Sequence, residues 1–411
     1  MFISSILGVN SGLSYALLVS TFTAYLKDAN VGLELIGILS LRTIPYSFKF
    51  LWSPLVDSLH INFFPRSFGQ NKSWLITMQF CLVVSIVIMA LVDIETNLYL
   101  ACFVALVAAF FAATYDIAME SYRIELNKAS EINGVNSFVV LGFRLGFIIS
   151  GGFALYLSDF IAWKWVFIAI AACNTLCMVI IFFFADSLKV KSEVISYNNI
   201  KHWFKKNVTM PFALLYRLPN FYLILLVLSF YKVSDGYLDT MLIPFLLEVG
   251  FSKGDVATIG KVIGLVAFIC GTFAGSYLIK KYILLKTLFT AEFLAAITNL
   301  LFILLAPHNV NKELLTIIVC VENFCAGICN IALITYMTSL CKHQRFTATH
   351  YAILISISGL SRALFGSTSG MVVAKVGWIE FFIISTLLSL PSFMCIFLLK
   401  RNEVSIKRSI I

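Results

Sequence analysis

The stretch ATYDIAMESYRIEL (residues 113–126) carries acidic and basic residues at the end of a long apolar run. Its part DIAMESYRIEL (116–126) aligns without a gap with NIALITYMTSL (330–340), sharing Ile, Ala, Tyr and Leu. A second pair follows in the same order: an Arg precedes a Gly by eight residues in GFRLGFIISGG (142–152) and in SRALFGSTSG (361–370). Two ordered matches at similar spacing indicate that the two halves of the chain are a parallel duplication.

The composition places the chain in a membrane. Of its 411 residues, 60% are hydrophobic and only 12% are charged, and the mean hydropathy is +0.94. Soluble domains are about half apolar and about a quarter charged. The apolar runs are continuous rather than alternating, which argues against an outer-membrane barrel. At roughly 20 to 25 residues per crossing, the chain is long enough for about twelve helices. We expect these near residues 3–26, 34–57, 73–93, 97–122, 133–158, 163–186, 219–247, 254–279, 283–306, 312–340, 347–374 and 378–399.

The net charge of +9 does not indicate a nucleic-acid partner, because the Lys and Arg residues gather in every second loop. This bias sets the orientation of membrane proteins and predicts cytoplasmic N- and C-termini. The longest polar stretch lies in the middle of the chain. We therefore predict an N-terminal six-helix bundle at 1–186, a cytoplasmic basic linker at 187–218, a C-terminal six-helix bundle at 219–400 and a cytoplasmic tail at 401–411. Within the linker, HWFKK (202–206) is a candidate amphipathic helix on the membrane surface, although a plain basic linker also explains it.

A parallel duplication of six helices is the major-facilitator arrangement, in which solute binds near the midplane at the interface of the repeats. The expected fold class is therefore an all-α integral membrane protein with two pseudo-symmetric bundles. Small-residue stretches such as GVNSG (8–12) and GSTSG (366–370) lie within the expected helices. We interpret them as positions where helices approach closely.

Charged residues inside apolar helices are costly, so each is a candidate functional residue. Asp116 and Glu120 lie one helical turn apart, at a Cβ separation of roughly 5–6 Å. Two close carboxylates in an apolar setting favour a bound proton on one of them near neutral pH. We predict that the pair couples transport to protons. The alternative is a structural cluster that pairs with Arg123 or Arg144.

A second candidate site lies in YKVSDGYLD (231–239). Lys232, Asp235 and Asp239 share one helix face, and we predict the two acids as proton-coupling residues and Lys232 as a solute ligand. An internal ion pair that exchanges partners can act as a switch in an alternating-access protein. Mutual neutralisation of Lys232 and Asp235 is the simpler alternative.

A third group supplies positive charge and hydrogen-bonding side chains for an anionic solute. Arg42, Tyr46 and Lys49 share a face of the second expected helix, which Pro residues interrupt. Arginine can clamp a carboxylate or phosphate through two parallel hydrogen bonds. Salt-bridge locks between helices are the alternative role. The further predicted solute ligands are Arg144, Lys261, Asn323, Asn330 and Arg362, and the weaker acidic candidates are Glu292 and Glu322.

Gating residues are predicted at the inner membrane boundary. Asp57 closes the second expected helix, and Arg66 lies in the loop that follows. Together with Arg123 they are expected to form a latch that opens and closes during transport.

Other kinds of chemistry find little support in the sequence. The cysteines lie in apolar runs and no His or Asp cluster completes a metal site, so we expect neither metal nor cofactor. The five His residues are scattered and show no pairing with a nucleophile, so we expect no enzyme activity. The duplicated halves and the internal ion pairs favour a carrier over a channel. We expect a monomer whose partners are a small-molecule solute, protons and the lipid bilayer.

Five stretches resemble the AmpG-type muropeptide permeases of the major facilitator superfamily, in the same order along nearly the whole chain: PYSFKFLWSPLVD (45–57), ATYDIAMESYR (113–123), GFRLGFIISGGFAL (142–155), GFSKGDVATIGKVIGL (250–265) and RFTATHYAILIS (345–356). The resemblance implies a proton-driven importer of anhydro-muropeptides for cell-wall recycling in the bacterial inner membrane. It places Asp116 in the family's Gln-Asp-type motif, with Tyr115 in place of Gln, and Glu120 where the family often has Asp. Asp235 and Lys261 fall in matching stretches.

The resemblance leaves the solute open, because a related branch carries acetyl-CoA across organelle membranes. The alternative prediction is therefore a major-facilitator carrier of another organic anion, such as a coenzyme A or a nucleotide-like solute.

Overall fold

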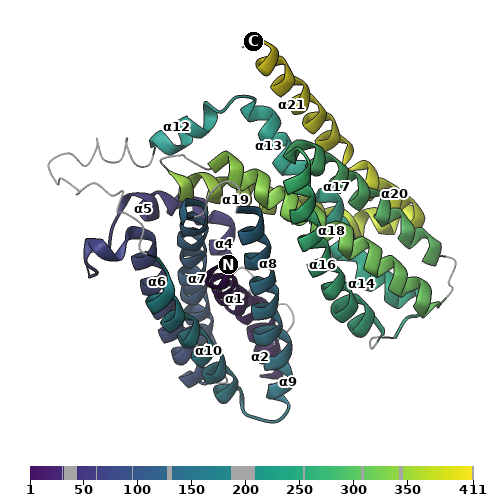
Figure 1. Ribbon diagram of the computed structural model, residues 1–411. Helices are drawn as coiled ribbons and strands as arrows, with labels where there is room; N and C mark the ends of the chain where they lie inside the picture. The colour runs from purple at the N-terminus through teal and green to yellow at the C-terminus, as the bar shows by residue number, and fades with distance from the viewer. Residues whose placement is uncertain are drawn as a thin grey trace. The chain divides into compact units, whose positions relative to one another are not determined.

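The computed structural model describes residues 1–29, 31, 44–61, 63–94, 96–126, 132–186, 209–252, 255–306, 310–341 and 346–409. These residues form helices and turns, and no strand occurs among them (Figure 1). They divide into two compact units, of which unit 1 comprises Met1–Leu214 and Cys341–Ser356, and unit 2 comprises Leu215–Leu340 and Ile357–Ile411. Ten helices of the described part are long and apolar enough to cross a membrane. The chain is therefore a multi-pass membrane protein.

Unit 1 contains the first six predicted helices, several of them in segments. Its elements are α1 (Phe2–Ala16), η1 (Leu17–Thr21), α2 (Phe22–Asp28), α4 (Ile44–Phe48), η3 (Lys49–Leu51), α5 (Ser53–Ser58), η4 (Arg66–Phe68), α6 (Gln70–Leu91), α7 (Leu98–Leu126), α8 (Ile132–Phe147), η5 (Ile148–Phe153), α9 (Ala154–Ser158), α10 (Trp163–Phe184) and α12 (Met210–Tyr216). Wider π-helical turns at η1 and η5 lie within two of the spans. The candidate helix at 202–206 lies outside the described residues.

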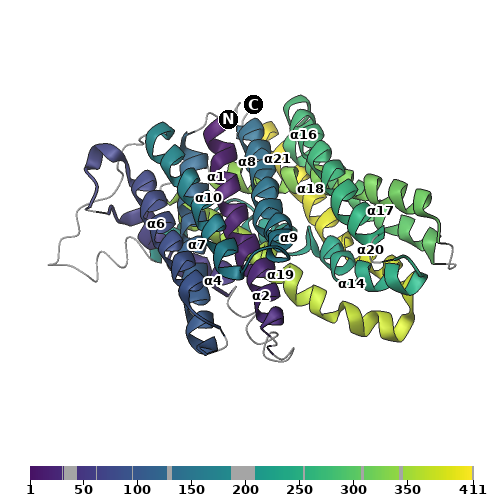
Figure 2. The same cartoon turned by 90° about the horizontal axis from the view of Figure 1, so that it is seen from below.

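Glycines bring α1 and α8 into contact along their length, and Figures 1 and 2 both show the two helices side by side. A Cβ atom at Gly12 would lie 2.0 Å from the carbonyl oxygen of Phe143, and one at Gly8 would lie 2.2 Å from that of Val139. From the other side, a Cβ at Gly142 would lie 2.1 Å from the carbonyl oxygen of Ser5. Only glycine permits backbones this close, so the GVNSG stretch is a packing element of the kind common in membranes.

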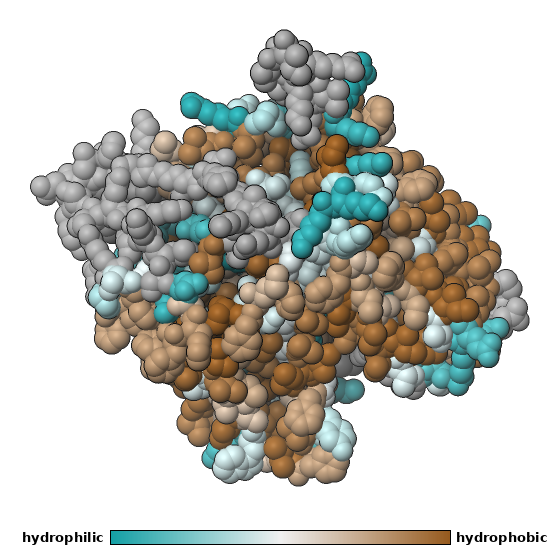
Figure 3. Space-filling view, in the orientation of Figure 1, coloured by the Kyte–Doolittle hydropathy of each residue, from teal (hydrophilic) through white to brown (hydrophobic). Residues whose placement is uncertain are grey.

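Alanines line the buried face of α7. Ala105, Ala108, Ala109 and Ala112 are at most 1% exposed, and α6 packs on this helix. Large apolar side chains instead cover the outward surface, as Phe103 does at 62% exposure. Hydrophobic colouring dominates the face seen in Figure 3. Small residues inside and large apolar residues outside are the pattern expected when lipid is the solvent.

The described part of the second predicted span is broken between α4 and α5. Pro54 has no N–H for the carbonyl of Phe50, which would be its helical partner. The hydroxyl of Ser53 donates to that carbonyl at 3.0 Å instead. Lys49 lies in the resulting 3-10 turn and is only 6% exposed. The break therefore carries a buried ammonium group into unit 1.

Unit 2 contains the last six predicted helices. Its elements are α13 (Phe221–Phe230), α14 (Val233–Val249), η8 (Val256–Ile263), α16 (Gly264–Lys281), α17 (Leu284–Asn299), η9 (Leu300–Leu305), α18 (Lys312–Cys341), α20 (Trp378–Leu387), α21 (Leu390–Ser409) and the greater part of α19 (Thr347–Val376). The seventh span is interrupted between α13 and α14, and Lys232 occupies the N-terminal cap of α14 with φ −117°. Like Lys49 in the second span, Lys232 in the seventh span lies at a break in a helix of its unit.

Two predicted spans are absent from the ten apolar helices of the described residues. Residues 34–43 of the predicted span at 34–57 lie outside the described part. The predicted span at 347–374 exists as the 30-residue helix α19, but its many Ser, Thr and Gly residues make it too polar to qualify by hydropathy. A helix that presents hydroxyls in place of large apolar groups is suited to contact with other helices rather than with lipid.

Candidate functional sites

Asp116 lies on α7 within a polar site of unit 1. The hydroxyl of Ser11, on α1, donates a hydrogen bond of 2.7 Å to its Oδ1. The buried ammonium of Lys49 and the carboxylate of Glu120 both interact with it electrostatically. Among the described residues, the carboxylate thus has one hydrogen-bond donor, Ser11, and interacts with the positive charge of Lys49 and the negative charge of Glu120. A small movement of Lys49 would change its affinity for a proton, which is the behaviour a proton-coupling group needs.

Aromatic rings surround this acidic site. Tyr46 lies close enough to Asp116 for electrostatic interaction, and its ring meets that of Tyr15 edge to face at 5.3 Å. The ring of Phe143 lies 5.9 Å from Tyr15. The indole nitrogen of Trp52 donates to Thr114 Oγ1 at 3.0 Å, and Thr114 lies two residues before Asp116 on α7. Tyr and Trp rings combine an apolar face with a polar group that can form a hydrogen bond.

Glu120 and Arg123 form an ion pair along α7. The Nε of Arg123 donates to Glu120 Oε2 at 2.9 Å, and its Nη2 contacts the same oxygen. Arg123 is only 2% exposed, and its guanidinium lies 5.5 Å from the ring centroid of Tyr351, which belongs to α19. The structure therefore joins the predicted proton-coupling residue Glu120 to the predicted gating residue Arg123.

Asp57 binds the beginning of α19. Its carboxylate accepts hydrogen bonds from the backbone N–H of Ala348 at 3.1 Å, from the backbone N–H of Thr349 at 2.7 Å and from the Thr349 hydroxyl at 2.6 Å. The first N–H groups of a helix have no partner within the helix, and the positive end of the helix dipole favours a carboxylate there. Sequence reasoning missed this partner, although Thr347 and Thr349 are typical of a helix start.

A second lysine, Lys72, is buried close to the loop that follows Asp57. Lys72 lies in the first turn of α6, is 6% exposed, donates to the carbonyl oxygen of Ala185 at 2.7 Å and lies over the Phe68 ring. Arg66 falls in the short turn η4, and its side chain is outside the described part.

The structure says little about three of the predicted solute ligands. Arg42 lies outside the described residues. Lys261 falls in η8, and its side chain is likewise not described. Arg144 lies on α8, partly buried, two residues before Gly146.

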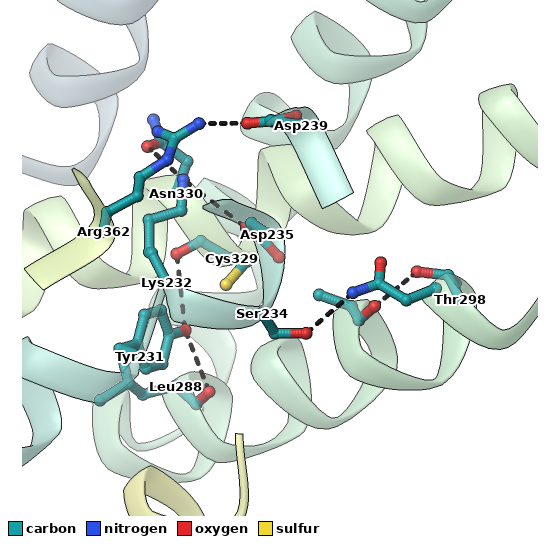
Figure 4. Close-up of polar contacts among 12 residues, drawn as sticks. Tyr231, Lys232, Ser234, Asp235, Asp239, Leu288, Thr298, Cys329, Asn330 and Arg362 are labelled. Atoms are coloured by element: carbon teal, nitrogen blue, oxygen red, sulfur yellow. Dashed lines mark hydrogen bonds and ion pairs between the residues drawn. The ribbon is translucent and has the colours of Figure 1, made fainter. Parts of the chain in front are cut away.

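Unit 2 gathers a charged cluster around Lys232 (Figure 4). The Nζ of Lys232 donates to Asn330 Oδ1 at 3.2 Å and lies 3.8 Å from Asp235 Oδ2. Asp235 is 9% exposed and lies in the first turn of α14, where the helix dipole favours an acid. The sequence offered the pairing of Lys232 with Asp235 as the simpler alternative to proton coupling and solute binding, and the structure adds Asn330 from α18.

Arg362 and Asp239 form the second ion pair of this cluster. Arg362 crosses α14 at Gly236, where a Cβ would lie 2.5 Å from the Cγ of the arginine. Asp239 is exposed at its end of the pair. Glycine at 236 therefore makes room for a cation that reaches Asp239 from α19.

Glu322 adds a further buried acid to unit 2. It is 8% exposed, accepts a hydrogen bond from the amide of Asn323 at 2.6 Å and interacts electrostatically with Asp235, Asp239 and Lys232. Glu322 thus belongs to the same charged cluster, although the sequence ranked it below Asp235. Asn323 holds this acid and also donates to the Val319 carbonyl.

The two units place related residues at matching positions. Asp116 in α7 and Asn330 in α18 occupy the same place when counted from the first residue of each helix. Each lies beside a lysine from a broken span, Lys49 or Lys232. This agrees with the duplication inferred from the sequence.

Comparison with known proteins gives the family. The model of the Major Facilitator Superfamily matches residues 4–349. The chain is 30% identical over 399 residues to the anhydromuropeptide permease of Escherichia coli K12, covering 97% of this chain and 79% of the relative. It is 31% identical over 402 residues to transporter AmpG 4 of Rickettsia felis, covering 97% and 96%. The chain belongs to the major facilitator superfamily and to its AmpG-type branch.

Solved structures agree with this assignment at the level of the fold. The fucose transporter FucP in its outward conformation matches with a TM-score of 0.69 at 14% identity, over 96% of this chain and 99% of that one. The human organic anion transporter MFSD10 matches with a TM-score of 0.71 at 13% identity, over 96% and 98%. The predicted major facilitator fold is thereby confirmed, and the protein is a transporter rather than an enzyme.

Proposed function

We propose that this AmpG-type transporter is a proton-coupled importer of anhydro-muropeptides, GlcNAc-1,6-anhydro-MurNAc peptides, for cell-wall recycling. Transport proceeds by alternating access in the inner membrane of a bacterium, with both termini in the cytoplasm. The bundles correspond to residues 1–186 and 219–400, joined by the linker 187–218 and followed by the tail from 401. The solute assignment rests on the identity with the Escherichia coli permease.

The observation that carries the proposal is that each unit holds a buried acid within electrostatic reach of a lysine at a broken helix. In unit 1, Lys49 interacts electrostatically with Asp116. In unit 2, Asp235 faces Lys232 at 3.8 Å. A carrier needs charged groups that are neutralised by one another when empty and by its cargo when loaded. Both pairs satisfy this requirement inside spans where an isolated charge is costly.

The solute chemistry matches the side chains present. A muropeptide offers sugar hydroxyls, amides and several carboxylates. The rings of Tyr15, Tyr46 and Phe143 supply faces for sugar in unit 1. Lys232, Asn330 and Arg362 supply donors for carboxylates and amides in unit 2.

Proton coupling follows from the same pairs. When a solute carboxylate attracts Lys49, the charge that stabilises ionised Asp116 is withdrawn, and Asp116 binds a proton. A neutral carboxyl then costs less to enclose in an apolar interior than an ion. Release of the solute on the other side restores the electrostatic interaction of Lys49 with Asp116 and expels the proton.

Uptake by vesicles that contain the purified transporter tests the solute. Labelled anhydro-muropeptide tetrapeptide is offered under an inwardly directed proton gradient, with acetyl-coenzyme A as the competing candidate. We expect accumulation of the muropeptide, inhibition by unlabelled muropeptide and no inhibition by acetyl-coenzyme A. Uptake of the coenzyme without uptake of the muropeptide would replace the proposed solute with an organic anion of the second class.

A further inference from the structure

Glu292 is a buried acid that lies outside the solute ligands named above. It lies on α17 and is 2% exposed. The hydroxyl of Ser392, on α21, hydrogen-bonds to its Oε1. Its Oε2 is buried and has no hydrogen-bond partner among the described residues. A carboxylate ion with a single donor in an apolar interior is far less stable than the neutral acid.

The corresponding place in unit 1 is occupied by an amide. Gln79 lies on α6, in the span Gln70–Leu91, and Glu292 lies in the span Leu284–Leu305, which has the same 22-residue length. Counted from the first residue of each span, the positions of Gln79 and Glu292 differ by one. The Nε2 of Gln79 donates to Asn10 Oδ1 at 2.6 Å and to the Asn174 carbonyl at 2.9 Å. Unit 1 thus ties three helices together with neutral amides. Unit 2 uses a carboxyl of the same shape, which differs from glutamine in being able to bind and release a proton.

The titratable groups around Glu292 come from three neighbouring elements. Asp235 on α14, Tyr231 just before it and Cys329 on α18 all interact with Glu292 electrostatically. The Tyr231 hydroxyl donates to the carbonyls of Leu288 and Cys329, at 3.1 and 3.5 Å, so its proton is engaged elsewhere (Figure 4). Asp235 is the charged group of this set, and its charge repels a second anion.

We propose that Glu292 is a proton-binding site of unit 2, loaded at neutral pH and controlled by the charge of Asp235. While Lys232 holds Asp235 in its ionised form, Asp235 keeps the proton on Glu292. When Asp235 is neutralised, Glu292 releases its proton more readily. The proton-binding site stands independently of the solute, and only its use during transport rests on the proposed function.

Infrared spectroscopy of the full-length transporter in lipid nanodiscs tests this directly. The carbonyl stretch of a protonated carboxyl is absent from an ionised one, so a pH titration counts loaded acids. We expect Glu292→Gln to remove one such band at neutral pH. Asp235→Asn should move the titration of that band to lower pH, and Ser392→Ala should shift its frequency. Glu313→Gln, at an exposed acid in the first turn of α18, is the matched control and should leave the neutral-pH bands unchanged.

A Glu292→Gln spectrum identical to that of the parent would overturn the inference. If Glu292→Gln fails to fold, the other two variants decide. A carboxyl band whose frequency is unchanged in Ser392→Ala and whose titration is unchanged in Asp235→Asn would also overturn the inference. In vesicles, Glu292→Gln should abolish pH-driven accumulation and retain counterflow if Glu292 takes part in coupling. Glutamine has the shape of a neutral carboxyl, so the substitution would leave accumulation intact if the role of Glu292 were only structural. Absence of muropeptide uptake by the parent protein would refute the proposed solute and leave the spectroscopic result standing.

Discussion

The carboxylate of Asp57 accepts hydrogen bonds from both the backbone N–H and the hydroxyl of Thr349, at 2.7 and 2.6 Å. With the N–H of Ala348, these bonds make Asp57 the cap of a 30-residue helix that begins 290 positions later in the chain. The residue that caps a helix usually lies next to that helix in sequence, whereas Asp57 belongs to a different span. The first turn of α19, which itself belongs to unit 1, is held by this carboxylate.

Removal of this cap should destabilise the transporter. We expect Asp57→Ala to lower stability by about 1 kcal/mol and at most ~2 kcal/mol, the usual cost of losing a helix cap. Asp57→Asn, which keeps an acceptor but loses the charge, should have a smaller effect. The thermal unfolding midpoint of the purified protein measures both. Asp159→Ala, at an exposed acid, is the control, and an equal loss in that variant would contradict a specific role for Asp57.

Close packing of α1 on α8 should not tolerate a methyl group. A Cβ at residue 12 would overlap the Phe143 carbonyl, so Gly12→Ala forces the helices apart. We expect a loss of roughly 1–3 kcal/mol, typical of overpacking. Gly359→Ala in α19 is the matched control, because nothing lies within 4 Å of a Cβ there. Its higher helix propensity should leave stability unchanged or raise it slightly. Unfolding midpoints that fall equally in both variants would argue against the observed helix contact.

An ion pair before the eighth span should make stability depend on pH. The Nζ of Lys312 lies 2.7 Å from Asp255, and the Ser252 hydroxyl also donates to this carboxylate. Hydrogen bonding from Lys312 and then from Ser252 lowers the pKa of Asp255 below its ordinary value. A lowered pKa in the folded state stabilises the fold above the unfolded-state pKa, and this contribution is lost as pH falls through the folded-state value.

Asp255→Asn should therefore lower the unfolding midpoint slightly at neutral pH, and the difference from the parent should vanish in acid. Added salt should reduce it, since the Lys312 side chain is exposed. Thermal unfolding across a pH series makes the comparison. A difference that persisted unchanged at low pH would mean that the pair contributes through something other than charge.

The fold was largely accessible from the sequence. Hydropathy and the repeat located the spans because lipid imposes a strong requirement for continuous apolar helices. The Pro residues of the second span indicated the break near Lys49. The break at Lys232 was less accessible, because a turn in a buried helix depends on neighbours that supply its hydrogen bonds. Hydropathy also placed the span at 347–374, although the helix α19 found there is more polar than the ten apolar spans of the described residues.

The candidate sites were accessible only in part. The pair Lys232–Asp235 is local and followed from helical spacing. The partners of Asp57 and Glu292 were not predicted, because Thr349 and Ser392 lie far away in sequence and hydroxyls carry little signal in a membrane chain. The burial of Lys72 was also missed, since a lysine near a loop is ordinarily solvated.

The central claim is that an acid inside the membrane carries the proton that drives import, and Asp116 is the residue assigned to it in unit 1. The most direct test adds anhydro-muropeptide to weakly buffered vesicles with no imposed gradient and records the external pH. We expect solute entry to make the medium more alkaline with the parent protein. Asp116→Asn should abolish this proton uptake while solute counterflow continues. Solute entry without proton movement in the parent, or undiminished proton uptake in Asp116→Asn, would contradict the account.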